Sequence, residues 1–217
     1  MIILSIDTTS EFGSIALTNG ERVVEELPLH SPDGFGHVLY GHLEQLLVRH
    51  GVNVGDVECF AAASGPGSFT GVRVGLTAVK GLAEATGKRV VAVSNLRAIA
   101  WFGSAPLRAT VLDARRGEVY SAVYNDRLET IMPEAVLKYE AWGKTLPPHG
   151  FELISSDFSS FHSHIDSSIA TVTAPRALAG VIGRIAWSEF RGGRACDPAE
   201  IDANYVRRSD AELFWKD

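Results

Sequence analysis

The sequence predicts an α/β fold made of two lobes, each of which begins with an antiparallel strand meander. Short apolar runs within residues 1–27 are separated by Asn19-Gly20, a dipeptide typical of tight hairpins. Apolar residues then recur three and four positions apart, which is typical of helices packed on a sheet. From Arg108 the same succession of strand, turn and strand starts again. This repetition indicates two lobes, each a mixed sheet covered by helices.

The first lobe is expected to contain five strands and three helices. Strands are assigned where short apolar runs alternate with polar residues or are continuous, and helices where apolar residues recur at helical spacing. The expected strands cover 1–5, 13–17, 21–27, 57–63 and 88–93, and the expected helices cover 35–49, 70–85 and 96–102.

A turn at Gly103–Pro106 is the predicted boundary, which gives a first lobe of residues 1–104 and a second of residues 105–217. The second lobe restarts with a three-stranded meander and carries weaker signals for a fourth strand and a long helix. These elements are expected at 108–113, 118–124, 128–137, 151–155 and 177–190.

Composition places the chain among ordinary globular proteins. Of its 217 residues, 46% are hydrophobic and 21% are charged, and the formal net charge is −6. Both halves share the acidic excess, which disfavours a protein that binds nucleic acid by itself. Two cysteines, Cys59 and Cys196, fit a reducing cytosol, and no apolar run approaches the about 20 residues of a membrane-spanning helix. No basic leader precedes the first apolar run, so we expect a cytoplasmic protein without membrane contact.

Two catalytic motifs are nearly present around Gly65 but fail in detail. The stretch SGPGSFTG at 64–71 lies between an expected strand and an expected helix, yet Val72 stands where a phosphate-binding P-loop has Lys. Ser68 lacks the glycines two positions to either side that a nucleophile elbow requires. We therefore expect no catalytic residue in this segment.

The seven histidines are spaced for a protein surface rather than for a metal site. His37 and His42 are five positions apart on the expected first helix, so they point about 140° away from each other. His162 and His164 alternate in a serine-rich stretch without a pattern of carboxylates or cysteines. A metal site is the less favoured alternative.

Asp7, Thr8, Thr9 and Ser10 form a candidate nucleotide-binding feature at the end of the first strand. A carboxylate there would hold Mg²⁺ through water, while hydroxyls and turn amides would donate to phosphate. An Asx or Ser/Thr turn that closes the hairpin is the favoured alternative.

The matching position of the second lobe follows Asp113, where a phosphate clamp needs glycines so that backbone amides approach the phosphates. Arg115 and Arg116 occupy this turn instead. We therefore expect half of the clamp to be missing.

The second expected helix has an unusual number of glycines. Gly71 and Gly75 are four positions apart, and a glycine inside a helix costs about 1 kcal/mol, so we expect another backbone to approach closely. That backbone belongs either to the same domain, as core packing, or to a partner subunit. The candidate interface joins this edge to the apolar stripes of both helices and contains Leu39, Leu43, Leu46, Leu47, Gly71, Val72, Gly75, Leu76 and Val79.

Three segments together resemble the TsaB (YeaZ) family: SGPGSFTGVRVGLTAVKGL at 64–82, IDTTS at 6–10 and DARRGEVY at 113–120. The likeness covers both lobes in order, and the first run is specific to this family and to its relative TsaD. The resemblance implies the two-lobed fold of actin, sugar kinases and Hsp70. It also implies a part in the bacterial machinery that places threonylcarbamoyl on the adenosine beside the anticodon of tRNAs that read codons beginning with A.

In that machinery TsaD carries a metal-binding histidine pair and the transfer chemistry, TsaB is its structural partner, and TsaE is an associated ATPase. This chain lacks such a histidine pair and lacks a glycine-rich turn directly after Asp113, so it resembles the non-catalytic TsaB. The resemblance implies a heterodimer with a TsaD-like protein, association with a TsaE-like ATPase, and contact with tRNA only through the complex. A homodimer is expected when the partner is missing. ATP or ADP with Mg²⁺ at a shared subunit interface is the one cofactor considered.

Two other functions remain as alternatives. An independent ATP-dependent phosphotransferase or ATPase of the same fold would use Asp7 to organise Mg²⁺. A metallopeptidase, the older label of this superfamily, would need a metal site that the spacing does not supply. Four arginines are candidates for contact with tRNA or nucleotide, with solvated surface arginines as the alternative: Arg115, Arg116, Arg207 and Arg208.

Overall fold

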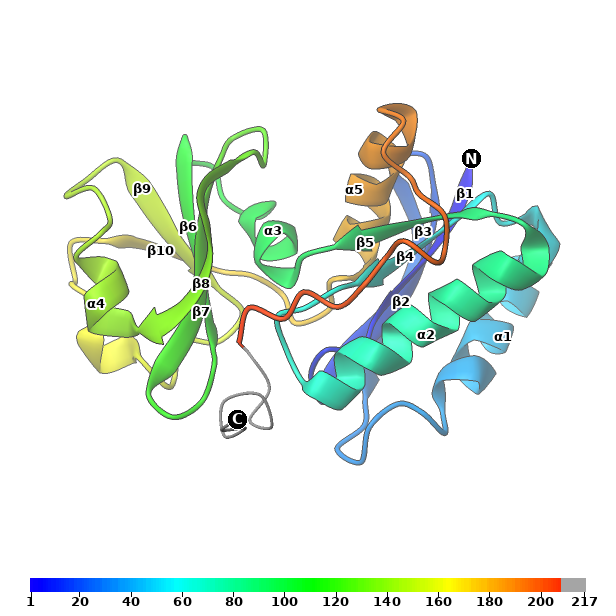
Figure 1. Ribbon diagram of the computed structural model, residues 1–217, viewed down its shortest axis with the longest axis horizontal. Helices are drawn as coiled ribbons and strands as arrows, with labels where there is room; N and C mark the ends of the chain where they lie inside the picture. The colour runs from blue at the N-terminus through cyan, green and yellow to red at the C-terminus, as the bar shows by residue number, and fades with distance from the viewer. Residues whose placement is uncertain (208–217) are drawn as a thin grey trace, which may run out of the picture. The chain divides into compact units, whose positions relative to one another are not determined.

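The computed structural model describes residues 1–207, which form two compact units (Figure 1). The first unit contains Met1–Ala98 and Arg176–Ala203. The second contains Ile99–Pro175 and the described residues from Asn204 on. The chain therefore leaves the first unit, builds most of the second, returns to the first and enters the second again at Asn204.

Five strands form the sheet of the first unit: β1 (Ile2–Asp7), β2 (Phe12–Asn19), β3 (Arg22–His30), β4 (Cys59–Ala63) and β5 (Arg89–Val93). They lie in the order β3-β2-β1-β4-β5. The first three strands pair antiparallel through tight connections, as the Asn19-Gly20 turn predicts. β4 and β5 continue the sheet parallel to β1. The central strand β1 is therefore paired on both sides and almost wholly buried.

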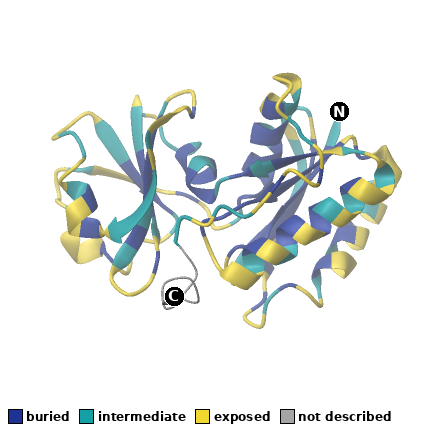
Figure 2. Ribbon diagram, in the orientation of Figure 1, coloured by how far each residue is buried: buried dark blue, intermediate teal, exposed yellow. Residues whose placement is uncertain are grey.

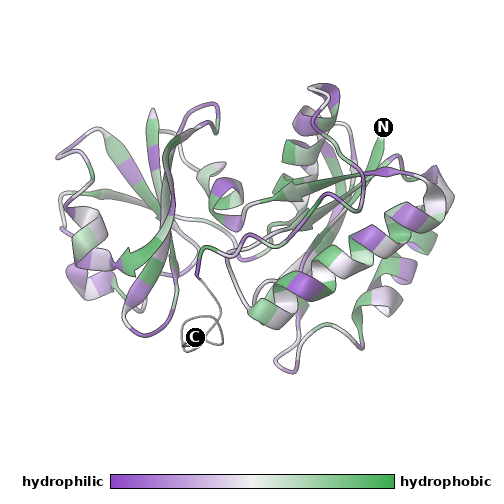
Figure 3. Cartoon of the chain, viewed as in Figure 1, coloured by the Kyte–Doolittle hydropathy of each residue, from purple (hydrophilic) through white to green (hydrophobic). Residues whose placement is uncertain are grey.

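Helices cover both faces of this sheet. α1 (Leu39–Arg49) and α2 (Phe69–Thr86) pack on one face, and α5 (Ala179–Arg191) packs on the other (Figure 1). The strands are mostly hydrophobic, whereas the helices combine hydrophobic and hydrophilic residues (Figure 3). This difference follows from geometry, because a sheet covered on both faces buries both sets of side chains and a surface helix buries only one stripe.

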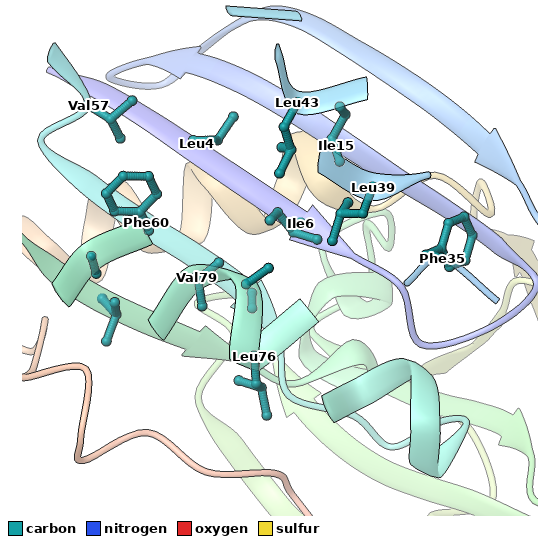
Figure 4. Packing of buried hydrophobic residues seen from close by; sticks show 14 of the residues in the cluster. Leu4, Ile6, Ile15, Phe35, Leu39, Leu43, Val57, Phe60, Leu76 and Val79 are labelled. Atoms are coloured by element: carbon teal, nitrogen blue, oxygen red, sulfur yellow. The ribbon is translucent and has the colours of Figure 1, made fainter. Parts of the chain in front are cut away.

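The main core lies between the sheet and the pair α1 and α2 (Figure 4). Because side chains alternate along a strand, Leu4 and Ile6 of β1 point to this core, whereas Ser5 points to the face covered by α5. The labelled core side chains in Figure 4 are Leu4, Ile6, Ile15, Phe35, Leu39, Leu43, Val57, Phe60, Leu76 and Val79.

The N-terminus of α5 is tied to β2 and β3. The Ser14 hydroxyl oxygen accepts hydrogen bonds from the N–H groups of Leu178 and Ala179 at 3.0 and 2.8 Å. A carboxylate oxygen of Glu26 accepts from the Gly180 N–H at 2.9 Å. The first N–H groups of a helix have no partner within it, so the sheet supplies their acceptors.

The second unit has its own five-stranded sheet, made of β6 (Leu107–Asp113), β7 (Glu118–Asn125), β8 (Thr130–Lys138), β9 (Phe151–Ser155) and β10 (Ala170–Thr173). The strands lie in the order β10-β9-β6-β7-β8, with the antiparallel meander β6-β7-β8 followed by parallel strands. The strands nearest the centre of the sheet carry most of the buried residues (Figure 2).

An aromatic cluster closes one face of this second sheet. Tyr139 and Trp142 come from the short helix α4 (Tyr139–Gly143), and the Phe161 ring stacks on Tyr139 with 5.5 Å between ring centres. These rings supply the apolar area that a five-residue helix alone lacks. The other short helical elements of the described chain are α3 (Asn95–Ala100) and the 3₁₀ turns Val54–Asp56 and His162–His164.

The α/β architecture with a meander at the start of each lobe is confirmed, and the lobe boundaries differ from those predicted. The structure places Arg176–Ala203 in the first unit rather than in a continuous second lobe of 105–217. The reason is the contact of α5 with the first sheet. The predicted elements also omit α4 and β10, because the former is too short for a helical period and the latter is a four-residue edge strand without a buried residue.

Candidate functional site

The predicted nucleotide-binding residues lie together in the turn between β1 and β2. Asp7, Thr8 and Thr9 are buried, whereas Ser10 is exposed. The Asp7 Oδ1 atom accepts hydrogen bonds from the Thr9 backbone N–H at 2.9 Å and from the Thr9 hydroxyl at 2.7 Å. The Oδ2 atom accepts from the Asn95 side-chain amide at 3.3 Å. The bond to the Thr9 N–H makes an Asx turn, so the turn alternative is confirmed.

The Asp7 carboxyl group belongs to a closed network within the chain. Burial raises the pKa of Asp7 above its ordinary value of 3.8, and hydrogen bonds from Thr9 and Asn95 offset only part of this rise. Asn95 also donates to the Thr9 hydroxyl oxygen at 2.8 Å and accepts from the Gly65 N–H at 3.1 Å. Asn95 is not among the predicted site residues. The signal that could have identified it is the polar pair Ser94-Asn95 directly after a buried strand.

Three glycines allow the segment that starts α2 to approach this turn. A Cβ atom on Gly67 would lie 2.5 Å from the Thr9 carbonyl oxygen. One on Gly71 would lie 2.0 Å from the Thr8 carbonyl oxygen, and one on Gly75 would lie 2.8 Å from the Thr8 hydroxyl oxygen. That hydroxyl donates to the Gly71 carbonyl at 2.7 Å. The close approach that the glycines predict is therefore made by the chain's own turn.

These bonds limit what the turn can do chemically. The Asp7 carboxylate and the hydroxyls of Thr8 and Thr9 all have partners inside the chain. A phosphate or a Mg²⁺ ion would have to replace those partners before it could bind the same atoms. Nucleotide binding by this turn stays a prediction.

The apolar stripes predicted to bind a partner need correction, because they belong to the chain's own core. Leu47 packs partly buried against that core, and Gly71 and Gly75 contact the turn between β1 and β2. A helix on a sheet turns its apolar stripe toward the sheet, so the stripe marks the inner face. The other six predicted residues are at most 4% exposed: Leu39, Leu43, Leu46, Val72, Leu76 and Val79.

The outward sides of α1 and α2 carry exposed apolar side chains that the stripe analysis missed. Tyr40 and Val48 of α1 are 56% and 72% exposed, and Phe69 at the start of α2 is 48% exposed. The Arg73 guanidinium lies 3.7 Å from the centre of the Phe69 ring. Residues four positions apart along α2 lie on one side of the helix, and this spacing from Phe69 onward is the sequence signal that would have identified the exposed side. We define the outer helix face as Tyr40, Gly41, Val48, Phe69, Arg73, Thr77 and Gly81.

In the second unit, the turn between β6 and β7 has a left-handed backbone. Arg115, Arg116 and Gly117 have φ angles of 63°, 59° and 72°. The Asp113 Oδ1 atom accepts a hydrogen bond from the Arg115 N–H at 2.7 Å. Arginines therefore occupy the position where a phosphate clamp would place glycines, as the sequence indicates.

Arg207 braces this turn from the C-terminal segment. Its guanidinium donates to the Ala114 carbonyl at 2.6 Å and to the Glu118 carboxylate, and it lies 5.7 Å from the centre of the Tyr120 ring. A structural role explains these contacts. Arg208, the fourth arginine considered for tRNA or nucleotide, lies outside the described residues.

Within residues 1–207, neither a cluster of metal ligands nor a membrane-spanning helix is found. No group of three or more His, Cys, Asp or Glu side chains in that range is placed to hold a metal ion. His164 and His50 instead pair with the carboxylates of Glu140 at 3.2 Å and Glu25 at 2.6 Å. Burial raises the pKa of the Cys59 thiol to about 12, which disfavours a thiolate nucleophile there. The helices in this range are all too short or too polar to cross a bilayer.

Comparison with known proteins points to one family. The profile described as tRNA N6-adenosine threonylcarbamoyltransferase matches residues 35–170. The tRNA threonylcarbamoyladenosine biosynthesis protein TsaB of Bacillus subtilis is 29% identical over 99% of this chain and 98% of its own length. The protein of the same name from Escherichia coli is 36% identical over 64% of each chain.

The structural comparison agrees with the sequence comparison. YeaZ from Pseudomonas aeruginosa aligns with a TM-score of 0.79 and 25% identity, over 94% of this chain and 99% of YeaZ. This likeness confirms the predicted two-lobed fold of the actin, sugar-kinase and Hsp70 type. The family profile covers more than half of the chain, and the likeness over nearly the full length is to TsaB and YeaZ. The chain therefore belongs to the TsaB/YeaZ family, within the wider family of tRNA N6-adenosine threonylcarbamoyltransferases.

Proposed function

We propose that this chain is the non-catalytic subunit of a complex that makes threonylcarbamoyladenosine in tRNA, and that it binds and supports a TsaD-like transferase. Family membership supports the pathway, because the relatives named TsaB match nearly the whole chain. The proposal places the protein in the cytoplasm, where tRNA is modified. A TsaE-like ATPase is the expected third component.

The observation that carries the proposal is the outer helix face. Tyr40, Val48 and Phe69 expose about half or more of their side chains on two helices that cover the same face of one sheet. Aromatic residues of this kind are enriched in protein interfaces. Because the inner stripes of α1 and α2 fill the chain's own core, the outer side is the part of these helices that a partner can reach.

Two exposed glycines indicate how closely a partner would approach. Gly41 of α1 and Gly81 of α2 are exposed, and a Cβ atom added to either would meet nothing within 4 Å. Unlike Gly71 and Gly75, they have no packing reason within the described chain. A glycine in a helix costs about 1 kcal/mol relative to alanine, so close approach of a partner's helix would explain both positions.

The turn between β1 and β2 already has its polar side chains hydrogen-bonded within the chain at Asp7, Thr8 and Thr9, which supports a non-catalytic role. Asp7 is surrounded by donors from its own chain, and Arg115 and Arg116 fill the second turn. A nucleotide at an interface with the partner would therefore need groups that the partner supplies. The outer helix face would also form the homodimer that we expect for the isolated chain, since a two-fold interface uses one patch twice.

The experiment replaces Gly81 by Arg and measures affinity for the TsaD-like partner by calorimetry or size-exclusion chromatography. The new side chain enters open space in the isolated chain, so its melting temperature should not fall. Affinity for the partner should drop by at least about 30-fold, equivalent to about 2 kcal/mol, because the helices can no longer approach.

The matched control is Ile131→Glu, which changes another exposed apolar residue, 53% exposed on β8 of the second unit. It should leave the affinity unchanged. Wild-type affinity in Gly81→Arg, or an equal loss in Ile131→Glu, would contradict the assignment of the outer helix face. The variant Gly75→Arg is unsuitable, because its side chain would collide with Thr8 inside the fold.

A further inference from the structure

We propose that the edge strand β10 is a self-association site, at which two copies of this chain pair their β10 strands antiparallel about a two-fold axis. The site lies in the second unit, whereas the outer helix face lies in the first, so the inference goes beyond the proposed function. Pairing of this kind would join the second-unit sheets of the two copies into one sheet.

Three of the four sheet edges in the described chain carry devices that hinder pairing with another strand. β5 is covered, because the Val90 N–H donates to the Cys196 carbonyl at 3.0 Å and the Cys196 N–H donates to the Val90 carbonyl at 3.0 Å. β3 carries an exposed proline, Pro28, and β8 carries Pro133 and Lys138, which are both exposed. Proline and charge on an edge strand disfavour the addition of a further strand.

The fourth edge, β10, has neither a covering segment nor a charge nor a proline within the strand. No charged residue occurs from 167 to 175, and the strand itself reads Ala-Thr-Val-Thr. Ala170, Thr171 and Thr173 are exposed, and Val172 is half-buried. Threonine and valine favour extended strands. β10 is therefore the edge of the described chain best suited to accept another strand.

The backbone of β10 directs a regular set of groups toward its free edge. Just after the strand, the Ala174 N–H donates to the Ser155 carbonyl of β9 at 2.9 Å. Because the backbone groups of successive residues point to opposite sides of a strand, Thr171 and Thr173 direct their N–H and C=O groups away from β9. Within the described chain β10 pairs with β9 alone, so these groups can bond to the strand of another chain.

This edge is complementary to itself. In an antiparallel pair centred on Val172, Thr171 of one copy would lie opposite Thr173 of the second copy, and each such pair would exchange two hydrogen bonds. Val172 would meet Val172 of the second copy at the closer, non-hydrogen-bonded position, where two β-branched side chains pack well.

The charge pattern favours a second copy as the occupant. A residue on a two-fold axis faces its own copy, so a charged residue there would meet a like charge, which is destabilising. The strand and its flanks from 167 to 175 are uncharged, so two copies can meet along this edge without such repulsion, although the whole chain carries a net charge of −6.

The test measures self-association of the full chain by sedimentation equilibrium, in a Gly81→Arg background that prevents association through the outer helix face. This chain should still form a dimer as its concentration rises, a weak one because a four-residue strand supplies few hydrogen bonds. Adding Val172→Lys should raise the dimer dissociation constant at least about tenfold, because two ammonium groups would face each other across the axis. Adding Ile131→Lys is the matched control, since it places the same charge on the exposed β8 edge, and it should leave the constant unchanged.

A second variant separates pairing from folding. Thr171→Pro removes an N–H that points to the free edge and takes no part in the bonds to β9, so the melting temperature should stay close to that of the parent chain while the dimer is lost. A Gly81→Arg chain that remains monomeric at every concentration would overturn the proposal, and so would a dimer that survives both Val172→Lys and Thr171→Pro. Affinity for the TsaD-like partner tests the proposed function separately, because α1 and α2 belong to the other unit.

Discussion

At the scale of single residues, Asp7 shows how a carboxylate at a strand end can serve the fold. Thr9 and Asn95 donate to it, and glycines bring the start of α2 against the neighbouring Thr8. Such a carboxylate is typical both of a phosphate site and of an Asx turn, so the residue types alone leave the two open. The Asx turn is made by the N–H of Thr9, two residues away, but the second partner of Asp7 is Asn95, more than 80 residues away in the chain, which no local pattern specifies.

The buried carboxyl group predicts a pH dependence of stability. Because burial raises the folded-state pKa of Asp7, the folded chain binds this proton more tightly than the unfolded chain does. The resulting stabilisation is complete below the ordinary pKa of 3.8 and is lost as the pH rises through the folded-state value. The free energy of unfolding of Asp7→Asn should therefore increase relative to that of the wild type as the pH rises from about 4 to 7. Urea titrations across this range measure the difference, and a difference that stays constant or shrinks would refute the raised pKa.

At the scale of elements, periodicity predicts most strands and both long helices of the first 104 residues, because each long element buries one regular face. It does not predict where α5 packs. The bonds from Leu178 and Ala179 to Ser14 span 164 and 165 residues, and no local pattern specifies such a contact. Periodicity likewise finds the apolar side of α1 and α2 but does not say whether sheet or partner covers it. Burial in the structure shows that the sheet does.

The anchoring of α5 can be tested with two serines. Ser14→Ala removes the acceptor of two N–H groups at the start of α5, which should cost about 2 kcal/mol of unfolding free energy because buried donors lose their partner. Ser121→Ala is the matched control, since that hydroxyl is also buried but has no hydrogen-bond partner within the described chain. Its removal should leave stability unchanged or raise it. Equal losses in both variants, measured by urea unfolding, would show that the bonds to α5 contribute little.

At the scale of the whole molecule, composition and family membership complement each other. An evenly acidic chain of 217 residues disfavours a self-sufficient RNA-binding protein but names no function. Membership of the TsaB/YeaZ family supplies the context of tRNA modification, and we propose that the outer helix face is the surface for a partner. The motif at 64–82 carries the resemblance most strongly, yet its glycines serve the chain's own packing at Gly71 and Gly75. The partner surface that we propose consists of less distinctive residues on α1 and α2.

Hydrogen–deuterium exchange on the chain with and without its TsaD-like partner tests the central claim most directly. Backbone amides become protected where a partner covers or stabilises them. We expect slower exchange on complex formation in peptides that cover α1 (Leu39–Arg49) and α2 (Phe69–Thr86), and unchanged exchange in β8 (Thr130–Lys138). Protection confined to β8 or to α5, with α1 and α2 unchanged, would contradict docking through the outer helix face.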